Sequence, residues 1–277
     1  MPMLKSALRD VLTESEIQHL SSSFDVIGDI AIIKIPPELS AKEKLIGDEL
    51  LHRMKNVRTV LKQDSDVKGE YRIRDVSIIA GEEKYETTYR ENGVQIKVDV
   101  RTVYFSPRLS TERARIASLV SEDEEIFNMF AGVGSFSFII AKSVKCKIHS
   151  VDINSEAIRL GEESLRLNRR LKGTVIPILS DAAAYAASHT DEFDRVLMPL
   201  PERAREFLPA AISSVKRSGG ILHYYVHVPE DEFEDMSWIE NHLKEVEFGR
   251  KYRVELWKRV REVGPRYIQA VADIRVL

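Results

Sequence analysis

A short apolar run broken by two closely spaced glycines is the feature that most constrains the fold of this chain. Residues 126–137 have the sequence Ile-Phe-Asn-Met-Phe-Ala-Gly-Val-Gly-Ser-Phe-Ser, and apolar residues continue after them. This pattern predicts a buried strand, a tight turn and a helix, the opening of a nucleotide-binding βαβ unit. Gly132 and Gly134 have no Cβ, so a ligand can approach the backbone and the free N–H groups of the helix N-terminus.

Two acidic residues follow the next two predicted strands. Residues 147–152 are expected to form a strand that ends in Asp152, and Asp181 follows a strand expected over residues 175–179. An acid about 20 residues beyond the glycine turn can bind ribose hydroxyls. The turn lacks a complete G-x-G-x-x-G, and the two acids favour a ligand with a ribose and an adenine but no diphosphate. This pattern resembles class I methyltransferases, which predicts S-adenosylmethionine as the ligand; helix capping is the alternative for each acid.

Composition limits the other classes of protein that this chain can belong to. Its 277 residues, 43% hydrophobic and 31% charged, are typical of a globular protein with one large domain or two small ones. No apolar run approaches the roughly 18 residues of a membrane span, so we expect a cytoplasmic protein without a membrane partner. The single Cys146 excludes an internal disulfide and a cysteine-rich zinc site. With a net charge of −3, the chain can hold a nucleic acid only through local basic patches.

The first third of the chain is expected to form a small, mostly antiparallel α+β module ahead of the βαβ core. Residues 1–23 are predicted to be helical, with Thr13 as an N-cap. The other expected elements are two strands around Gly28-Asp29, a helix over residues 40–55 with Ser40 as its N-cap, strands at 57–61 and 71–80, and a hairpin that turns at Asn92-Gly93.

The junction between this module and the core, residues 104–116, is rich in charge. Glu112 is surrounded in sequence by Arg108, Arg113 and Arg115. Ser110 is predicted to cap the helix that contains Glu112, which then lies one helical turn from Arg108 or Arg115. Such a group is either a solvated helix face or a site, and composition alone favours the solvated face.

A fourth core strand is predicted over residues 194–198, and Pro199-Leu200-Pro201 follows it. In this fold the carboxyl end of that strand faces the transferable group, so the prolines either belong to a site or only shape a turn. His223 and His227 share one face of a later strand. No third ligand accompanies them, so we predict no metal centre.

The C-terminal stretch combines basic and aromatic residues before a final strand, residues 268–276, that is expected to join the core sheet. Cations can neutralise phosphates and aromatic rings can stack on unpaired bases, so this stretch is a candidate RNA surface; an amphipathic hairpin is the alternative. The candidate RNA contacts in the junction and in this stretch are Arg108, Arg115, Arg253, Lys258 and Arg259, with Tyr252, Trp257 and Tyr267 as aromatic partners.

Three motifs together resemble a known family. They are Tyr-Phe-Ser-Pro-Arg-Leu-Ser-Thr-Glu-Arg at residues 104–113, Met-Phe-Ala-Gly-Val-Gly at 129–134 and Gly-Gly-Ile-Leu-His-Tyr-Tyr at 219–225. From residue 24 onward the chain is similar to the Trm-five and TYW-two enzymes of archaea and eukaryotes, which modify guanosine 37 of tRNA, beside the anticodon. One branch methylates guanine N1. The other transfers the aminocarboxypropyl group of S-adenosylmethionine to make wybutosine-type bases.

The resemblance implies roles for particular residues. Glu112 matches the general base that removes the guanine N1 proton, and Arg72 matches the arginine that stabilises charge on O6. The residues expected to bind S-adenosylmethionine, from the glycine turn and from the resemblance, are Ser106, Arg113, Phe130, Gly132, Gly134, Asp152, Ile153, Asp181, Ala182 and Pro199.

Departures from the methyltransferase pattern keep the second branch open. Methyltransferases usually have Asn-Leu-Pro where this chain has Pro199-Leu200-Pro201, and Asn128 replaces the usual acid at the end of the first strand. The tRNA-elbow domain of many archaeal methyltransferases is not expected here. In favour of the first branch, Pro107-Arg108-Leu109 is the methyltransferase form of the junction motif.

Together these patterns predict a tRNA (guanine-37-N1)-methyltransferase with an α/β fold. It would consist of an RNA-contacting α+β module, residues 1–105, and a Rossmann-like catalytic domain of the class I methyltransferase type, residues 106–277. We expect a cytoplasmic monomer that binds the anticodon loop. An aminocarboxypropyltransferase is the first alternative. The second is an inactive RNA-binding relative, against which the presence of both Arg72 and Glu112 argues.

Overall fold

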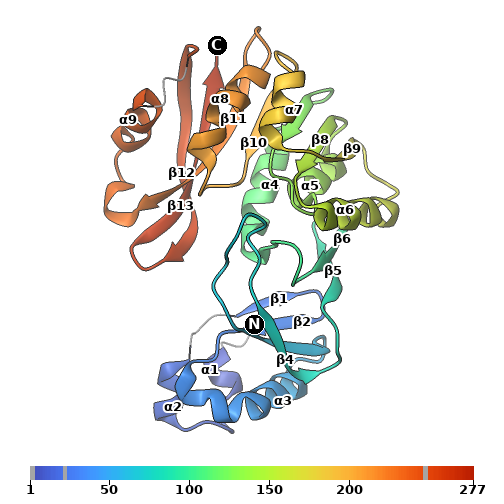
Figure 1. Cartoon of the computed structure of the whole chain (residues 1–277), viewed down its shortest axis with the longest axis vertical. Helices are drawn as coiled ribbons and strands as arrows, with labels where there is room; N and C mark the ends of the chain where they lie inside the picture. Colours follow the sequence, from blue (N-terminus) through green and yellow to red (C-terminus); the bar gives the residue numbers. More distant parts are fainter. Residues whose placement is uncertain (1–3, 21–23, 246–248) are drawn as a thin grey trace. The chain divides into compact units, whose positions relative to one another are not determined.

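The computed structural model describes residues 4–20, 24–245 and 249–277 (Figure 1). The chain divides into two compact units. The first comprises Met1–Arg90 and Gln95–Pro107, and the second comprises Glu91–Val94 and Arg108–Leu277.

The first unit contains a four-stranded sheet in the order β1-β2-β3-β4, in which only β2 and β3 are parallel. Its strands are β1 (Asp25–Ile27), β2 (Ile30–Ile33), β3 (Thr59–Gln63) and β4 (Val76–Gly81). Apolar side chains of these strands and of the helices form one buried core. The helices are α1 (Leu4–Ala7), α2 (Glu14–His19), the 3-10 helix η1 (Pro37–Lys42) and α3 (Glu43–Arg53). Thr13 caps α2 as predicted, whereas positions 1–3 and 21–23 of the predicted helical stretch lie outside the described residues.

Two predictions for this unit were wrong in their boundaries. Ser40 does not cap a helix, because η1 begins earlier, at Pro37, whose ring already fixes the backbone for a helical turn, and α3 begins only at Glu43. The strand predicted from residue 71 begins at Val76, because the preceding residues form a turn in which the Lys68 N–H donates to the Ile73 carbonyl.

The predicted hairpin is present as β5 (Glu86–Glu91) and β6 (Val94–Asp99), which form a two-stranded sheet. Asn92 and Gly93 have φ values of 46° and 74° at the turn. Positive φ at both central residues is the requirement of the turn type that matches strand twist, and Asn-Gly satisfies it.

The second unit is built on a seven-stranded sheet in the order β12-β13-β11-β10-β7-β8-β9 (Figure 1). The five strands from β11 to β9 in this order run parallel, whereas β13 is antiparallel to both β11 and β12. The strands are β7 (Glu125–Asn128), β8 (Lys147–Asp152), β9 (Thr174–Leu179), β10 (Arg195–Met198), β11 (Gly220–Pro229), β12 (Tyr252–Gly264) and β13 (Tyr267–Val276). This mostly parallel sheet confirms the predicted α/β fold and the predicted final strand.

Helices connect the strands and cover the sheet. They are η2 (Pro107–Leu109), α4 (Ser110–Leu119), α5 (Ser135–Ser143), α6 (Ser155–Leu167), α7 (Ala182–Ser188), α8 (Ala204–Ser214), η3 (Glu230–Glu232) and α9 (Ser237–Glu245). The chain crosses from β7 through β8 to β9 in one direction and then returns to β10 on the other side of β7. The strand order therefore reverses between β7 and β10, and ligands of such sheets bind at this point, outside the carboxyl ends of the strands. Among the described helices, none is long and apolar enough to cross a membrane.

Candidate functional site

The turn after β7 has the backbone geometry that its glycines predict. Gly132 and Gly134 have φ values of 53° and 80°, in the left-handed region that favours glycine. A Cβ on Gly134 would lie 3.0 Å from a ring carbon of Phe138, so the turn is also closely packed. Gly134 is the N-cap residue of α5 and makes no side-chain cap, which leaves the N–H groups of the first helical turn for other acceptors.

Asp152, the last residue of β8, holds this turn in place. Its Oδ2 accepts a hydrogen bond from the Gly132 N–H at 2.6 Å, and its Oδ1 accepts one from the Asn154 N–H at 2.9 Å. The side chain of Asn154, not that of Asp152, caps α6. The capping alternative is therefore wrong for Asp152. Each of its oxygens has a second lone pair, and the carboxylate can still accept hydrogen bonds from hydroxyls.

Burial raises the pKa of Asp152, and the hydrogen bonds from the Asn154 and Gly132 N–H groups act against this rise. A carboxylate with little water around it gains more from a hydroxyl donor than an exposed one does. The site is therefore suited to a ligand that brings its own donors, as a ribose does.

Asp181 is different, because it does cap a helix. Its Oδ1 accepts a hydrogen bond from the Ala184 N–H at 2.8 Å at the start of α7. The capping alternative is thus correct for Asp181, and a cofactor contact by its other oxygen stays a prediction. The apolar side chain of Ile153 is 42% exposed beside Asp152, whereas Ala182 is buried.

Phe130 and Pro199 follow the carboxyl ends of β7 and β10, which are paired in the sheet. The Phe130 ring is half-buried and packs with its edge against Phe207, with 4.9 Å between centroids. Beneath the turn, the fully buried Asn128 amide donates to Ser137 at 3.1 Å, and Ser137 is hydrogen-bonded to Ser150 at 2.9 Å. These bonds connect β7, α5 and β8, the three elements next to the turn.

The junction helix α4 is not a solvated face, contrary to the expectation from composition. Glu112 and Arg113 are 4% and 1% exposed. Ser110 does not cap the helix, because η2 leads directly into it and Leu109 occupies the cap position. The Arg113 guanidinium donates to both carboxylate oxygens of Glu91, at 2.7 and 2.5 Å. This buried ion pair occupies the Arg113 guanidinium and so argues against the predicted contact of Arg113 with the cofactor.

Glu112 lies at the centre of a second buried group. Its Oε2 accepts from Arg115 Nε at 2.8 Å, and its Oε1 accepts from Arg115 Nη2 at 2.7 Å and from the Tyr225 hydroxyl at 2.8 Å. Oε1 therefore accepts two described hydrogen bonds and Oε2 only one. A carboxylate oxygen has two acceptor positions, so Oε2 has capacity for one more donor.

The same arginine connects Glu112 to the sheet. Arg115 also donates to Asp273 of β13, at 2.6 and 3.2 Å. Asp273 is opposite His223 of β11 in the strand register, and their side chains are hydrogen-bonded at 2.6 Å. We refer to Glu112, Arg115, Tyr225, His223 and Asp273 as the Glu112 cluster. The pairing of the Arg115 guanidinium with two carboxylates opposes its predicted role as a phosphate ligand, which stays a prediction.

Arg72, in the first unit, lies in a turn and not on the predicted strand. Its φ of 53° is unusual for a residue with a side chain, and such strain accompanies functional positions. Its guanidinium lies over the ring of Tyr104, 4.3 Å from the centroid, and Tyr104 begins the junction motif. Ser106, from the same motif, is buried. The roles of Arg72 and Ser106 stay predictions.

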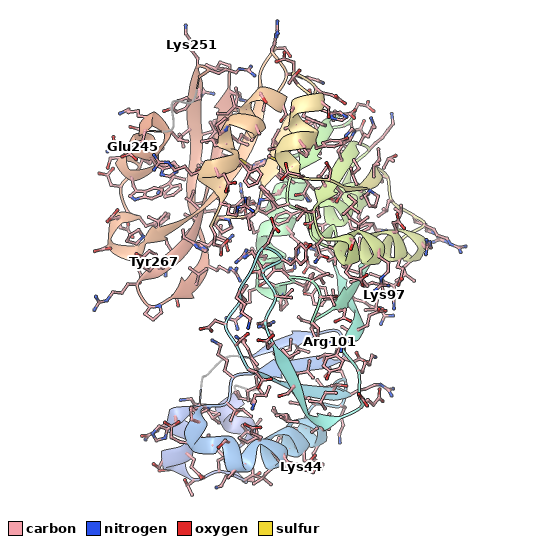
Figure 2. All side chains as sticks on the ribbon, viewed as in Figure 1. Lys44, Lys97, Arg101, Glu245, Lys251 and Tyr267 are labelled. Carbon is pink, nitrogen blue, oxygen red and sulfur yellow. The ribbon has the colours of Figure 1, made fainter. Side chains whose placement is uncertain are left out.

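The basic C-terminal stretch forms β12 and the turn into β13, as the hairpin alternative predicted. Two of its aromatic residues, Tyr252 and Trp257, are half-buried and pack against the core, and the Trp257 N–H donates to the Phe233 carbonyl at 3.0 Å. Tyr267 is 51% exposed at the hairpin turn, where Figure 2 labels it. Of the predicted cations, Arg253 pairs with Glu255, and Arg259 pairs with Glu230 and Glu262.

One group of side chains in the described part of the chain has metal-ligand types at close range. His149, His189 and Glu192 place one ligand atom each within 4.8 Å of one another. Both ring nitrogens of His149 are already hydrogen-bonded, to the Tyr185 hydroxyl and to Glu125, each at 2.7 Å. We therefore assign this group to the packing between β8 and α7.

Sequence reasoning missed Tyr225 and Asp273 as members of a site. Asp273 is the only acid in the mostly apolar run of residues 268–276, in which Gln269 and Arg275 are the other polar residues. A lone carboxylate in a strand that is expected to be buried needs a partner, and that signal could have directed attention to it. The partner itself, Arg115, lies 158 residues away and has no local signature.

Comparison with known proteins identifies the family of this chain. The TRM5/TYW2 methyltransferase domain matches residues 87–256, and the TYW2 N-terminal domain matches residues 4–84. The chain belongs to the TRM5/TYW2 family. The predicted membership of this family and the predicted class, an S-adenosylmethionine-dependent tRNA methyltransferase, are thereby confirmed.

The relatives of this chain are named for several tRNA-modifying activities. A tRNA (guanine(37)-N(1))-methyltransferase, Trm5b of Pyrococcus abyssi, is 44% identical over 94% of this chain and 76% of its own length. A tRNA 4-demethylwyosine(37)-methyltransferase, Taw21 of Saccharolobus solfataricus, is 34% identical over 93% and 95%. A tRNA(Phe) (4-demethylwyosine(37)-C(7)) aminocarboxypropyltransferase of Pyrococcus horikoshii is 29% identical over 99% and 96%.

Solved structures share the fold over nearly the whole chain. The complex of aTrm5 with tRNALeu superposes with a TM-score of 0.85 at 33% identity, covering 100% of this chain and 78% of that one. Methanocaldococcus jannaschii Trm5 in complex with adenosine gives a TM-score of 0.80 at 32% identity, covering 99% and 78%.

Proposed function

We propose that this chain is a tRNA (guanine-37-N1)-methyltransferase with Glu112 as its general base. The arrangement of Glu112 carries the proposal. Its carboxylate is held by Arg115 and Tyr225, and Oε2 has capacity for one more donor. A base that removes a ring N–H proton needs an oriented carboxylate with a free acceptor position. The similarity to Trm5b of P. abyssi supports guanosine 37 as the target.

In the proposed step, Oε2 of Glu112 accepts the proton of guanine N1. The electron pair left on N1 forms a bond to the methyl carbon of S-adenosylmethionine, and the S–CH3 bond breaks with its electrons going to sulfur. The products are N1-methylguanosine and neutral S-adenosylhomocysteine. Negative charge develops on O6 as the proton leaves, and we assign its stabilisation to Arg72.

The cofactor is proposed to bind at the carboxyl ends of β7, β8 and β9. Asp152 would accept hydrogen bonds from the ribose hydroxyls, because its half-buried carboxylate has unused acceptor positions. Ile153 offers exposed apolar surface to the adenine, and the second oxygen of Asp181 lies at the next strand end. Adenosine, the ligand of the M. jannaschii structure, is the part of the cofactor that these groups would bind.

The partner is proposed to be tRNA, bound near its anticodon loop. The aTrm5–tRNALeu complex supports a tRNA partner. On this chain, the exposed Arg108 and the cations of β12 are the proposed phosphate contacts, together with residues 1–105 as an RNA-contacting module. We further propose that the enzyme acts as a monomer in the cytoplasm, where it would meet its tRNA.

A second candidate reaction is favoured by one observation, Pro199 in the place of the usual asparagine after β10. Two relatives are named for methyl or aminocarboxypropyl transfer to 4-demethylwyosine. This chain matches 95% and 96% of their lengths. In a base whose N1 is already substituted there is no N1 proton to remove. The Glu112 carboxylate would then not be needed as the base for N1.

Mass analysis of nucleosides separates these reactions. The protein is incubated with S-adenosylmethionine and either a transcript with guanosine at position 37 or a tRNA with 4-demethylwyosine there. We expect N1-methylguanosine from the first substrate. A methyl or aminocarboxypropyl adduct on the second substrate alone would refute the proposal and favour the alternative, and no product from either would identify an inactive RNA-binding relative.

A further inference from the structure

Within the Glu112 cluster, a single guanidinium is shared by two carboxylates. Arg115 presents Nε and Nη2 to Glu112, and Nη1 and Nη2 to Asp273. Because a guanidinium is a rigid planar fork, fixing it from two sides leaves it little freedom to rotate. The contact with Asp273 therefore determines how Arg115, and through it the Glu112 carboxylate, is oriented.

The charges of the cluster do not cancel. Burial alone would lower the pKa of Arg115, but its bonds to Glu112 and Asp273 raise it above the usual range, so Arg115 is a cation. Burial would raise the pKa of Asp273, but His223 and Arg115 hold it well below the usual range, so Asp273 is an anion. An arginine paired with Glu112 alone would stabilise its negative charge fully and weaken it as a proton acceptor. In this protein the same cation is shared with Asp273, so removing the charge of Asp273 would leave Arg115 paired with Glu112 alone.

Asp273 is itself fixed without added charge. Arg195 Nη1 lies 2.7 Å from Nε2 of His223, and since arginine only donates, Nε2 must accept. The His223 proton is then on Nδ1, which donates to Asp273 at 2.6 Å. Burial lowers the pKa of the His223 imidazole, which favours this neutral form.

We infer that Asp273 is a positioning residue for the reaction at Glu112: through the shared Arg115 guanidinium it fixes the orientation of the Glu112 carboxylate. The inference rests on the proposed role of Glu112 as the general base. It gives a function to a buried acid in β13 that contacts neither Glu112 nor, by the proposal, either substrate.

The test uses Asp273→Asn, which keeps the shape of the side chain and removes its charge. Single-turnover methylation of a guanosine-37 transcript is measured across pH at saturating cofactor, with tRNA and cofactor affinities and thermal midpoints recorded alongside. We expect the rate to fall roughly 10- to 100-fold with both affinities unchanged, because misplacing a reacting group costs that much. The acidic limb of the pH–rate profile should move to lower pH, because Arg115 then pairs with Glu112 alone.

Arg115→Met gives the opposite signature. The groups that face Glu112 are Arg115 from α4, Tyr225 from β11 and, through Arg115, Asp273 from β13. Without the cation, two carboxylates remain close together in a buried place, so the acidic limb should move to higher pH. A purely structural role predicts no such pair of opposite shifts.

Asp194→Asn is the matched control. It removes the charge of a carboxylate that pairs with Lys216 at 2.7 Å just before β10, and the described contacts of the Asp194 side chain include no member of the Glu112 cluster. It should lower the thermal midpoint slightly and leave the rate and the profile unchanged. An Asp273→Asn profile that coincides with the control overturns the inference. Should Asp273→Asn fail to fold, an unshifted limb in Arg115→Met overturns it. An undiminished rate in Glu112→Gln would instead refute the proposed base.

Discussion

The glycine turn and the Glu112 cluster lie in the same unit but are built in different ways. At the turn, the Asp152 carboxylate accepts from backbone N–H groups, and its partner Gly132 is only 20 residues away. In the cluster, each partner of Glu112 and Arg115 is a side chain, and Tyr225 and Asp273 come from strands 113 and 158 residues away. The first region is suited to binding polar hydroxyls and the second to holding a charge. Binding and chemistry should therefore be separable by substitution.

The largest expected effect comes from Glu112→Gln, which changes only the cluster. The amide keeps the shape of the side chain but cannot accept the N1 proton, so single-turnover methylation should fall roughly 100-fold or more. Cofactor affinity, measured by calorimetry, should be unchanged because the glycine turn is not touched. A rate equal to that of the parent protein would remove the general-base role.

Asp152→Ala should produce the complementary result at the turn. The loss of charge-assisted hydrogen bonds to the cofactor should weaken its binding by on the order of 1.5–3 kcal/mol. The methylation rate at saturating cofactor should change far less. Asn154→Ala is the control, because it removes the cap of α6 and leaves the backbone N–H that donates to Asp152. Unchanged affinity in Asp152→Ala would contradict the assignment.

The pH dependence of cofactor binding sharpens the same assignment. Burial raises the pKa of Asp152, so its carboxylate is protonated at a higher pH than an ordinary aspartate. Cofactor affinity should accordingly be highest at neutral pH. As the pH decreases, the affinity should begin to fall at a pH above the range in which ordinary aspartates are protonated. Calorimetric titrations at several pH values measure this, and Asp152→Ala should abolish the dependence.

A smaller effect is expected from the cations of β12, which belong to neither region. Changing Arg253, Lys258 and Arg259 to Ala should weaken tRNA binding roughly 10-fold and make its salt dependence shallower, since fewer counterions are released. Arg253 and Arg259 are already paired with acids, which limits the loss. The control changes Lys145, Arg166 and Arg217, exposed cations elsewhere in this unit, and alters the net charge equally. Equal losses in both triple variants would show that β12 is not a specific contact.

The smallest expected effect is that of Asp181→Ala on stability. Losing the cap of α7 should cost about 1 kcal/mol of unfolding free energy. Asp181→Ser keeps an acceptor for the Ala184 N–H and should restore the stability, whereas its side chain is too short for a more distant cofactor contact. Calorimetry on both variants then separates the cap from the cofactor: normal affinity in each would leave Asp181 a cap only.

The same contrast explains what could be predicted from the sequence. Strands β7, β8 and β9, the glycine turn and the place of Asp152 follow from local patterns, because apolar runs and glycines act over a few residues. The burial of α4 and the pairing of Arg115 with Asp273 depend on which residues of β11 and β13 are opposite each other. That register depends on the whole sheet. For this reason the α4 face that was expected to be solvated contains instead the buried Glu112 cluster. Arg72 lies in a turn and not in the predicted strand. The backbone hydrogen bonds of that turn outweigh the alternating pattern of the sequence.

The long outer strand β12 also has a consequence for the solubility of the protein. It lies at the edge of the seven-stranded sheet, and its pairing with β13 shifts register at three places. An exposed edge strand is a template for association with another chain, and charged side chains and bulges are the devices that prevent it. The cations of β12 therefore have a second use as a barrier to aggregation, and a variant that replaces them with apolar residues would be at risk of forming edge-to-edge assemblies even before it met any RNA.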